Sequence, residues 1–365
     1  NPEDFYANDA MAITMSHLGY IKRTPLVDYK NQSKGGVGSR GSRTREADFT
    51  EQLYVANAHD MLLFFTRKGR VHWLKCYEIP EGAKDSKGRA IQNMLELEPG
   101  DSVNAVLEIE SHKFVDPEFL QSHNVVFATK NGTVKKTRLA DYSHVRTKGV
   151  IAINILEGDE VVNVVLTNGS DEIILASRNG KAVRFNENLI RTMGRVSTGV
   201  RGMNLSLDEE PDNEVIGMIV VHDPDNDTIM VVSEKGFGKR TKVEDYRMTN
   251  RGTKGVKTLN ITDKTGKLLA INTVQDDEDL MIINKSGITI RFSVASCRVM
   301  SRGTQGVKLI DLKKKNDYIA SVCKVMHIDE DEELLDELAE GEENVDVKSA
   351  DTDAPANNET PETQE

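Results

Sequence analysis

Apolar runs followed by a glycine turn and a basic segment recur six times along the chain. Each run is rich in β-branched residues, and the segment after the turn alternates apolar with polar side chains. A period of two is typical of β-strands, and glycine accepts the positive φ that a tight hairpin turn requires. The pattern therefore predicts six β-hairpins, whose turn glycines are Gly19, Gly69, Gly132, Gly180, Gly236 and Gly287.

Two further landmarks repeat downstream of each turn glycine. About 17 to 19 residues beyond it stands a second glycine, usually followed by Val and a new strand, as in STGVRGMNL and GTQGVKLIDL. Ten residues beyond the turn glycine stands an apolar or aromatic residue, and these are Tyr29, Ile79, Tyr142, Ile190, Tyr246 and Cys297. The units recur at roughly 50 residues, more widely once where an insertion occupies residues 110–123.

Each unit thus supplies about four short strands, and helix signals are nearly absent. Repeated four-stranded units of this length indicate an all-β fold, a propeller-like ring of six blades that leaves only short sheet edges exposed. The alternative, two β-sandwiches with coincidental glycines, does not explain six matching turns with two matching landmarks. We predict one ring domain over residues 1–328 and a separate tail over residues 329–365.

The net charge of −12 is concentrated in that tail. Residues 329–365 hold 16 acidic residues and one lysine, whereas residues 1–328 hold 46 Lys and Arg against 43 Asp and Glu. A segment poor in aromatic residues and rich in acids, Asn, Thr and Pro does not bury enough apolar surface to fold, so disorder is predicted. Two roles stay open for the tail: a solubilising end, or a competitor for the basic part of the chain.

The strand after each turn carries positive charge. If the units form a ring, equivalent positions lie on one circumference, and bases that recur there form a belt. A curved basic belt binds a bent duplex through phosphate contacts, without reading its sequence. The predicted belt comprises Lys22, Arg23, Arg70, Lys135, Lys136, Arg138, Lys181, Arg184, Lys239, Arg240, Lys242 and Arg291, and the loops before the second glycines add Arg146, Lys148, Arg195, Arg251, Lys254 and Arg302. The alternative for each base is a solvated edge strand, where Lys and Arg prevent aggregation.

The segment QSKGGVGSRGSRTRE, residues 32–46, is a glycine-rich and basic loop. Gly38 follows Gly19 by 19 residues, so the loop stands where every unit has its second glycine. It lacks the GxxxxGK[ST] pattern of a nucleotide-binding loop. Its glycines permit close backbone approach to phosphate, and its N–H groups can form an anion-binding concavity.

The six units, the segments MAITMSHLGYIKRTPL, NGTVKKT and GFGKRT, and the acidic tail resemble the C-terminal, DNA-wrapping domain of DNA gyrase A over residues 8–328. The resemblance implies a six-bladed β-pinwheel, in which strands are exchanged between blades, that wraps DNA around its rim in a positive sense. The family's diagnostic loop, Gln-Arg-Arg-Gly-Gly-Lys-Gly, is matched here by Gln32, Gly35, Gly36 and Gly38, and in charge by Lys34. Ser33 and Val37 replace two of its bases, which predicts weaker wrapping unless Arg40, Arg43 and Arg45 compensate electrostatically.

The same resemblance implies that this chain has no catalytic residues, metal site or cofactor of its own. The family's strand-cleaving tyrosine lies in the N-terminal part of the gyrase A polypeptide, and ATP and Mg²⁺ bind the partner ATPase subunit of a heterotetramer. The isolated domain is expected to be a monomer. Consistent with this, the eight histidines form no HxH or HExxH pattern. Two alternatives stay open: the DNA-positioning domain of a topoisomerase IV-like decatenase, and a propeller that binds other proteins.

The sequence also predicts where the protein acts. No apolar run reaches the roughly 18 residues of a membrane helix, and the chain shows no secretory signal pattern. Cys76, Cys297 and Cys323 lie far apart, which suits a reducing compartment. We expect a cytoplasmic, nucleoid-associated protein that does not bind membranes.

Overall fold

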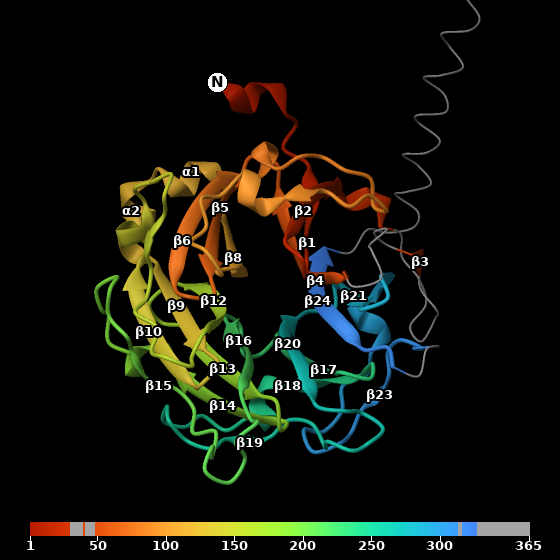
Figure 1. Ribbon diagram of the computed structural model, residues 1–365. Helices are drawn as coiled ribbons and strands as arrows, with labels where there is room; N and C mark the ends of the chain where they lie inside the picture. The colour runs from red at the N-terminus through yellow and green to blue at the C-terminus, as the bar shows by residue number, and fades with distance from the viewer. Residues whose placement is uncertain (30–38, 41–47, 313–315, 327–365) are drawn as a thin grey trace, which may run out of the picture. The chain divides into compact units, whose positions relative to one another are not determined.

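The computed structural model describes residues 1–29, 39–40, 48–312 and 316–326. Residues Asn1–Val325 form one compact unit, called the first unit below. The predicted acidic tail, residues 329–365, lies outside the described residues. The first unit holds six four-stranded antiparallel sheets arranged as a ring of blades (Figure 1), so the predicted all-β, six-bladed fold is confirmed.

The six predicted hairpins form the two middle strands of the six blades. Their strands are β1 (Ala10–Ser16) and β2 (Tyr20–Pro25), β5 (Met61–Thr66) and β6 (Arg70–Lys75), β9 (Asn124–Thr129) and β10 (Thr133–Arg138), β13 (Glu172–Ser177) and β14 (Lys181–Asn186), β17 (Thr228–Ser233) and β18 (Phe237–Lys242), and β21 (Glu278–Asn284) and β22 (Ile288–Ser293). All six turn glycines have φ between 85° and 93°, the left-handed conformation that explains their recurrence.

An inner strand completes each hairpin toward the centre of the ring. The inner strands are β4 (Thr50–Asn57), β8 (Val103–Ile109), β12 (Val161–Thr167), β16 (Val215–Val221), β20 (Leu268–Val274) and β24 (Ile319–Met326). Residues from all six strands line one central cavity of about 340 Å³. This shared cavity identifies the inner edge of every blade.

The outer strand of each blade has two residues and comes from the next unit of the sequence. These strands are β7 (Arg89–Ala90), β11 (Val150–Ile151), β15 (Val200–Arg201), β19 (Val256–Lys257), β23 (Val307–Lys308) and β3 (Ser39–Arg40). Blade 1 has the order β4-β1-β2-β7, and blades 2 to 5 repeat it. In blade 6 the outer strand is β3, which follows β2 in the sequence but pairs with β22. The ring therefore closes by strand exchange, as the resemblance implied.

The second glycine of each unit is explained by the approach of the outer strand to the preceding blade. Gly199 has φ +108°, and a Cβ there would lie 2.4 Å from the carbonyl oxygen of Val134. At Gly255 the corresponding oxygen, that of Ala182, would be 2.3 Å away. No real Cβ occupies such a position, so only glycine permits this crossing.

The core lies between adjacent blades rather than in one central cluster. Phe65 of blade 2 and Phe127 of blade 3 meet edge to face, with ring centroids 5.2 Å apart, and both are fully buried. The apolar landmark ten residues after each turn glycine directly follows or ends a short 3₁₀ turn and is buried in every unit. These turns are η2 (Leu26–Asp28), η3 (Cys76–Glu78), η5 (Leu139–Tyr142), η6 (Glu187–Leu189), η7 (Val243–Asp245) and η8 (Val294–Ser296).

The insertion predicted over residues 110–123 folds as two short helices, α1 (Ser111–Phe114) and α2 (Pro117–Ser122). Asp116 caps α2, because its carboxylate accepts a hydrogen bond of 3.0 Å from the backbone N–H of Glu118. Two further 3₁₀ turns, η1 (Pro2–Phe5) and η4 (Ile91–Asn93), lie at the N-terminus and in a blade connection. Within the described part of the chain, no helix has the length and apolar character needed to cross a membrane.

Candidate nucleic-acid interface

Seven of the bases predicted for the belt are buried. Each is at most 8% exposed, and they are Lys22, Arg23, Lys135, Lys136, Lys239, Arg240 and Arg291. They occupy the third and fourth positions of the second hairpin strand. Successive side chains of a strand point to opposite faces, and in this ring both faces are covered by neighbouring blades. A buried ammonium or guanidinium does not reach a phosphate, so the burial of these seven residues does not support the prediction that they contact DNA.

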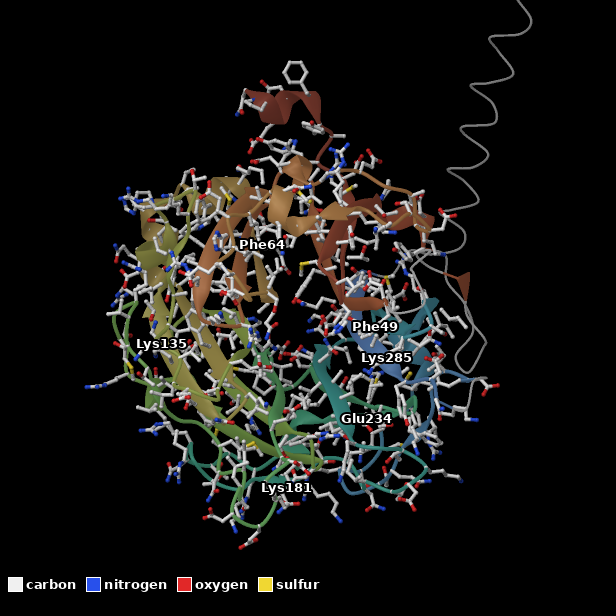
Figure 2. The ribbon with its side chains drawn as sticks, viewed as in Figure 1. Phe49, Phe64, Lys135, Lys181, Glu234 and Lys285 are labelled. Carbon is white, nitrogen blue, oxygen red and sulfur yellow. The ribbon has the colours of Figure 1, made fainter. Side chains whose placement is uncertain are left out.

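The lysines at the third position bind backbone carbonyl groups. The Lys135 ammonium donates hydrogen bonds to the carbonyl groups of Ala152 (2.6 Å) and Arg195 (2.7 Å), and it lies among strands rather than at the surface (Figure 2). Lys22 and Lys239 bind the carbonyl groups of residues 83–86 and 301–304 in the same way. Burial lowers the pKa of Lys135 to about 7 and those of Lys22 and Lys239 to about 8.

The fourth position of the same strand supplies a hydrogen-bond donor that joins each blade to the 3₁₀ turn of the next unit. The six bonds run from Arg23 to Ile79 O (2.6 Å), Trp73 to Tyr142 O (3.0 Å), Lys136 to Glu187 O (3.1 Å), Arg184 to Tyr246 O (2.9 Å), Arg240 to Cys297 O (3.3 Å) and Arg291 to Tyr29 O (2.9 Å). The last bond returns from the sixth unit to the first. These side chains therefore hold the ring together.

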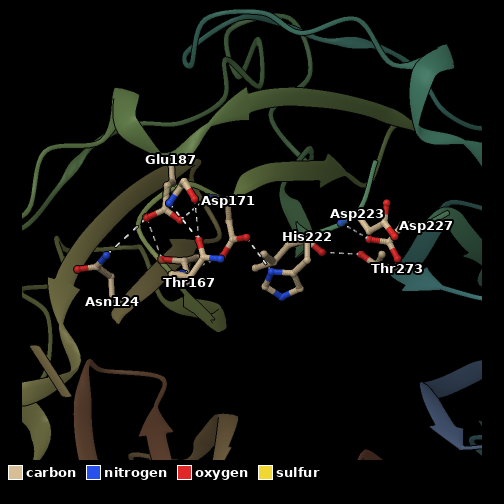
Figure 3. A network of polar contacts seen from close by, with 11 residues as sticks. Asn124, Thr167, Asp171, Glu187, His222, Asp223, Asp227 and Thr273 are labelled. Atoms are coloured by element: carbon tan, nitrogen blue, oxygen red, sulfur yellow. Dashed lines mark hydrogen bonds and ion pairs between the residues drawn. The ribbon is translucent and has the colours of Figure 1, made fainter. Parts of the chain in front are cut away.

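A buried carboxylate extends this joint between blades 3 and 4 (Figure 3). Glu187 is fully buried, and its carboxylate lies 3.6 Å from the Lys136 ammonium and accepts hydrogen bonds from Thr167 (3.0 Å) and the N–H of Asp171 (2.9 Å). The Asp171 carboxylate in turn lies 2.7 Å from Nδ1 of His222. Each buried charge in this network has a partner, which is the condition for burying it without a large free-energy cost.

The other predicted belt residues are partly or fully exposed, and most are already engaged. Arg70 lies 3.4 Å from a Glu98 carboxylate oxygen, Arg184 lies 2.7 Å from Glu172, and Lys242 lies 3.7 Å from Glu244. The exposed Arg138 donates to the carbonyl group of Gln121, and the half-buried Lys181 lies on β14, where it pairs with Lys257 (Figure 2).

Of the bases predicted in the glycine-rich loop, only Arg40 falls among the described residues. It lies on β3, where its backbone pairs with Ile288. The remaining predicted loop residues lie outside the described residues, and these are Gln32, Lys34, Gly35, Gly36, Gly38, Arg43 and Arg45.

Basic residues recur in five segments that we call the rim segments. Each begins at or just after the apolar landmark and runs to the outer strand, over residues 79–90, 143–151, 190–201, 246–257 and 297–308. The last four hold twelve Lys and Arg and no Asp or Glu, whereas residues 79–90 hold three bases and two acids. The exposed bases of the rim segments are Lys87, Arg89, Arg146, Lys148, Arg191, Arg201, Arg247, Lys254, Lys257, Arg298 and Lys308.

Three arginines of the rim segments hold these segments in place. Arg195 donates a hydrogen bond of 2.6 Å to the carbonyl group of Ile151 on β11. Arg251 and Arg302 donate in the same way to Arg201 on β15 (3.0 Å) and Lys257 on β19 (2.6 Å). Each of these rim segments is thus fastened to the outer strand before it in the ring.

Sequence reasoning missed the bases on the outer strands themselves. Arg201, Lys257 and Lys308 are exposed and occupy the second position of β15, β19 and β23. A signal for them exists, because each stands two residues after a second glycine in a Gly-Val-base triplet. A strand of two residues is too short for an alternation pattern to reveal it.

The rim segments offer cations rather than metal ligands. In the part of the chain that the structure describes, no group of three His, Cys, Asp or Glu side chains is placed to hold a metal ion. The exposed Lys and Arg side chains of the rim segments can bind anions by charge and hydrogen bonding.

Comparison with known proteins identifies the same six units. The chain matches the family described as "DNA gyrase C-terminal domain, beta-propeller" over residues 10–57, 60–110, 123–168, 171–222, 227–275 and 278–322. It is 40% identical over 359 residues to the DNA gyrase A subunit of Staphylococcus aureus strain NCTC 8325, and 41% identical to that of strain MRSA252. Both matches cover 98% of this chain, which spans 39% of the length of these relatives.

Solved structures share the fold. A structure of a DNA gyrase A C-terminal domain superimposes with a TM-score of 0.76 at 22% identity, covering 87% of this chain and all of that one. The C-terminal domain of a DNA topoisomerase IV superimposes with a TM-score of 0.65 at 25% identity, covering 92% of this chain and 99% of that one.

Proposed function

The chain belongs to the DNA gyrase C-terminal domain family, and on that premise we propose that its rim binds duplex DNA without sequence specificity and bends the duplex around the blades. The observation that carries the proposal is the composition of the rim segments. Four consecutive segments hold twelve bases and no acid, although the chain as a whole is acidic. A surface of this kind favours a polyanion over a protein partner of mixed charge.

The geometry of the rim supports contact with the DNA backbone rather than with nucleobases. Exposed Lys and Arg side chains recur at equivalent positions of three successive outer strands. The described rim segments contain no helix able to enter the major groove. Bending 20 to 30 base pairs costs of order 1 to 6 kcal/mol, so several phosphate contacts must share the cost. A rim that presents Arg201, Lys257 and Lys308 at the same position of three successive outer strands meets this requirement.

We propose that the chain acts as the C-terminal module of the gyrase A polypeptide and supports ATP-dependent negative supercoiling. Strand cleavage would then belong to the N-terminal part of that polypeptide, and ATP and Mg²⁺ to the ATPase subunit. Besides DNA, the proposed partners are the N-terminal part of the gyrase A polypeptide and the ATPase subunit, which together form the heterotetramer. The proposed site of action is the nucleoid. In this proposal the glycine-rich loop, with Gln32, Lys34 and Arg43, adds further phosphate contacts.

A second candidate function is the DNA-positioning domain of a topoisomerase IV-like decatenase. The superposition on a topoisomerase IV C-terminal domain supports it, as does the replacement of two loop bases by Ser33 and Val37. Both candidates bind DNA at the rim and differ in how strongly they wrap it.

An electrophoretic mobility shift with plain duplex, repeated from about 50 to 200 mM salt, tests the proposal. The expected result is binding at low salt that weakens steeply, because each phosphate contact contributes about 0.9 to the slope of log K against log salt. No binding at low salt would overturn the proposal and favour a propeller that binds proteins.

A further inference from the structure

The bases of the rim are not distributed evenly around the ring. The rim segment that ends on blade 1, residues 79–90, holds three basic and two acidic residues. The segment that ends on blade 2, residues 143–151, holds two basic residues and no acidic residue. Those that end on blades 3, 4 and 5 hold three, four and three bases with no acid. Positive charge therefore rises from blade 1 to blade 4.

The outer strands show the same asymmetry in register. Arg201, Lys257 and Lys308 pair with the first residue of β10, β14 and β18, respectively. The equivalent position is Ala90 on β7, Ile151 on β11 and Arg40 on β3, where Arg40 pairs with Ile288, the first residue of β22. Ile151 is 44% exposed, so an apolar side chain faces solvent where the next three blades present a cation.

The bases near blade 1 are further occupied by the protein itself. The Lys87 ammonium lies 3.9 Å from the centroid of the Tyr20 ring, and that of Lys84 lies 5.1 Å from the Tyr29 ring. The same rim segment holds two exposed acids, Glu81, which lies 3.5 Å from Arg23, and Asp85, so its net charge is lower than that of the other rim segments.

The bases on blades 3 to 5 face solvent. Among the described residues, no acidic partner is found for the exposed Arg191, Arg201, Arg247, Lys254, Lys257 and Arg298. Lys308 lies 3.6 Å from Asp311, with both side chains about half exposed. Such a surface pair contributes at most about 1 kcal/mol and is readily exchanged for a phosphate.

We infer that DNA contacts one arc of the rim, formed by the outer strands β15, β19 and β23 and their rim segments, and leaves the protein at blades 1 and 2. These three strands follow one another along the periphery of the ring (Figure 1). The inference rests on the proposed function and adds the part of the rim that bears the duplex. Residues 190–308 supply the arc, and Ile151 marks its end.

Two matched triple variants test the arc by its salt dependence. The first combines Arg201→Ala, Lys257→Ala and Lys308→Ala, and the second combines Arg89→Ala, Arg146→Ala and Lys148→Ala. Each removes three exposed bases. If all three residues of the first set contact phosphate, the salt slope of duplex binding falls by about 2.7 in the first variant and by less than about 1 in the second. Equal losses in both variants would overturn the arc.

Amine labelling of the unaltered chain gives a second readout that does not depend on any variant folding. With saturating duplex DNA, Lys254, Lys257 and Lys308 should be protected from an amine-reactive reagent, whereas Lys87 and Lys148 should react as in the free protein. Equal protection of both groups would contradict the arc while leaving DNA binding intact. If the unaltered chain does not bind duplex at all, the proposed function fails and the arc fails with it.

Discussion

The guanidinium of Arg291 donates a hydrogen bond of 2.9 Å to the carbonyl group of Tyr29, which lies 262 residues earlier in the chain. The same guanidinium lies 3.0 Å from the Asp279 carboxylate, and both side chains are at most 1% exposed. This bond is the sixth of a series that joins each blade to the next. It fastens the last unit to the first, beside the exchanged strand β3.

Replacement of Arg291 by Met should destabilise the ring strongly. Asp279 would remain in the interior without its ion pair to Arg291, and loss of one partner of a buried pair costs about 3 to 5 kcal/mol. Urea unfolding followed by circular dichroism measures the change. Arg201→Ala is the control, because an exposed base away from such pairs changes stability by less than about 0.5 kcal/mol. A loss below about 1 kcal/mol in Arg291→Met would show that the joint between the sixth and first units contributes little.

Gly199→Ala should destabilise the domain, whereas Gly194→Ala in the same rim segment should not. At Gly199 the new Cβ would lie 2.4 Å from the Val134 carbonyl oxygen, in a backbone conformation with φ +108°. Strain of this kind costs of order 1 to 3 kcal/mol. A Cβ on Gly194 would meet no atom within 4 Å. The two melting temperatures decide the point, and equal values would show that the rim segment shifts freely.

Stability should rise with pH between about 7 and 9 through the buried lysines. Burial lowers the pKa of Lys135 in the folded protein to about 7, against an ordinary value of 10.5. Between these values the unfolded chain binds more protons than the folded one, so the free energy of unfolding increases with pH. Lys135→Met removes the group from both states, and its free energy of unfolding should rise less steeply over this range. Parallel curves would show that the folded protein keeps the proton on Lys135.

The hairpins that form the two middle strands of each blade were predictable from the sequence. The residues that carry the exposed charge of the rim were not. Turn glycines and apolar landmarks indicated the six hairpins because their φ angles and burial are local requirements. The sequence analysis places the adjacent pairs Lys135–Lys136 and Lys239–Arg240 on one surface, whereas the structure buries all four side chains. Adjacent residues of a strand face opposite ways, so a surface belt does not accommodate both. The neighbouring blades decide which faces of a strand are buried, and the local sequence pattern does not show which faces those are.

The outer strands illustrate the complementary failure. Arg201 on β15 pairs with Thr133 on β10, across a boundary between units. Strand exchange of this kind is a property of the assembled ring, and the family resemblance supplied it where periodicity did not. The Gly-Val-base triplets were visible, but only the pairing register gives them one common position on the rim.

The acidic tail should weaken DNA binding. Residues 329–365 carry 16 acids, and an acidic segment tethered to a basic domain competes with phosphate. A chain ending at Ile328 should bind duplex more tightly at low salt, with a difference that shrinks as salt rises. Titrations of both chains across a salt series measure this. Identical affinities and slopes would assign the tail a solubilising role only.

The central claim, that the rim wraps DNA, is tested most directly by DNA topology. Relaxed circular plasmid is incubated with the chain, relaxed again with a type I topoisomerase, freed of protein and resolved by electrophoresis. The account predicts a protein-dependent shift toward positive linking difference, lost in the triple variant of Arg201, Lys257 and Lys308. Tight binding without any shift would contradict wrapping and favour a domain that only positions DNA.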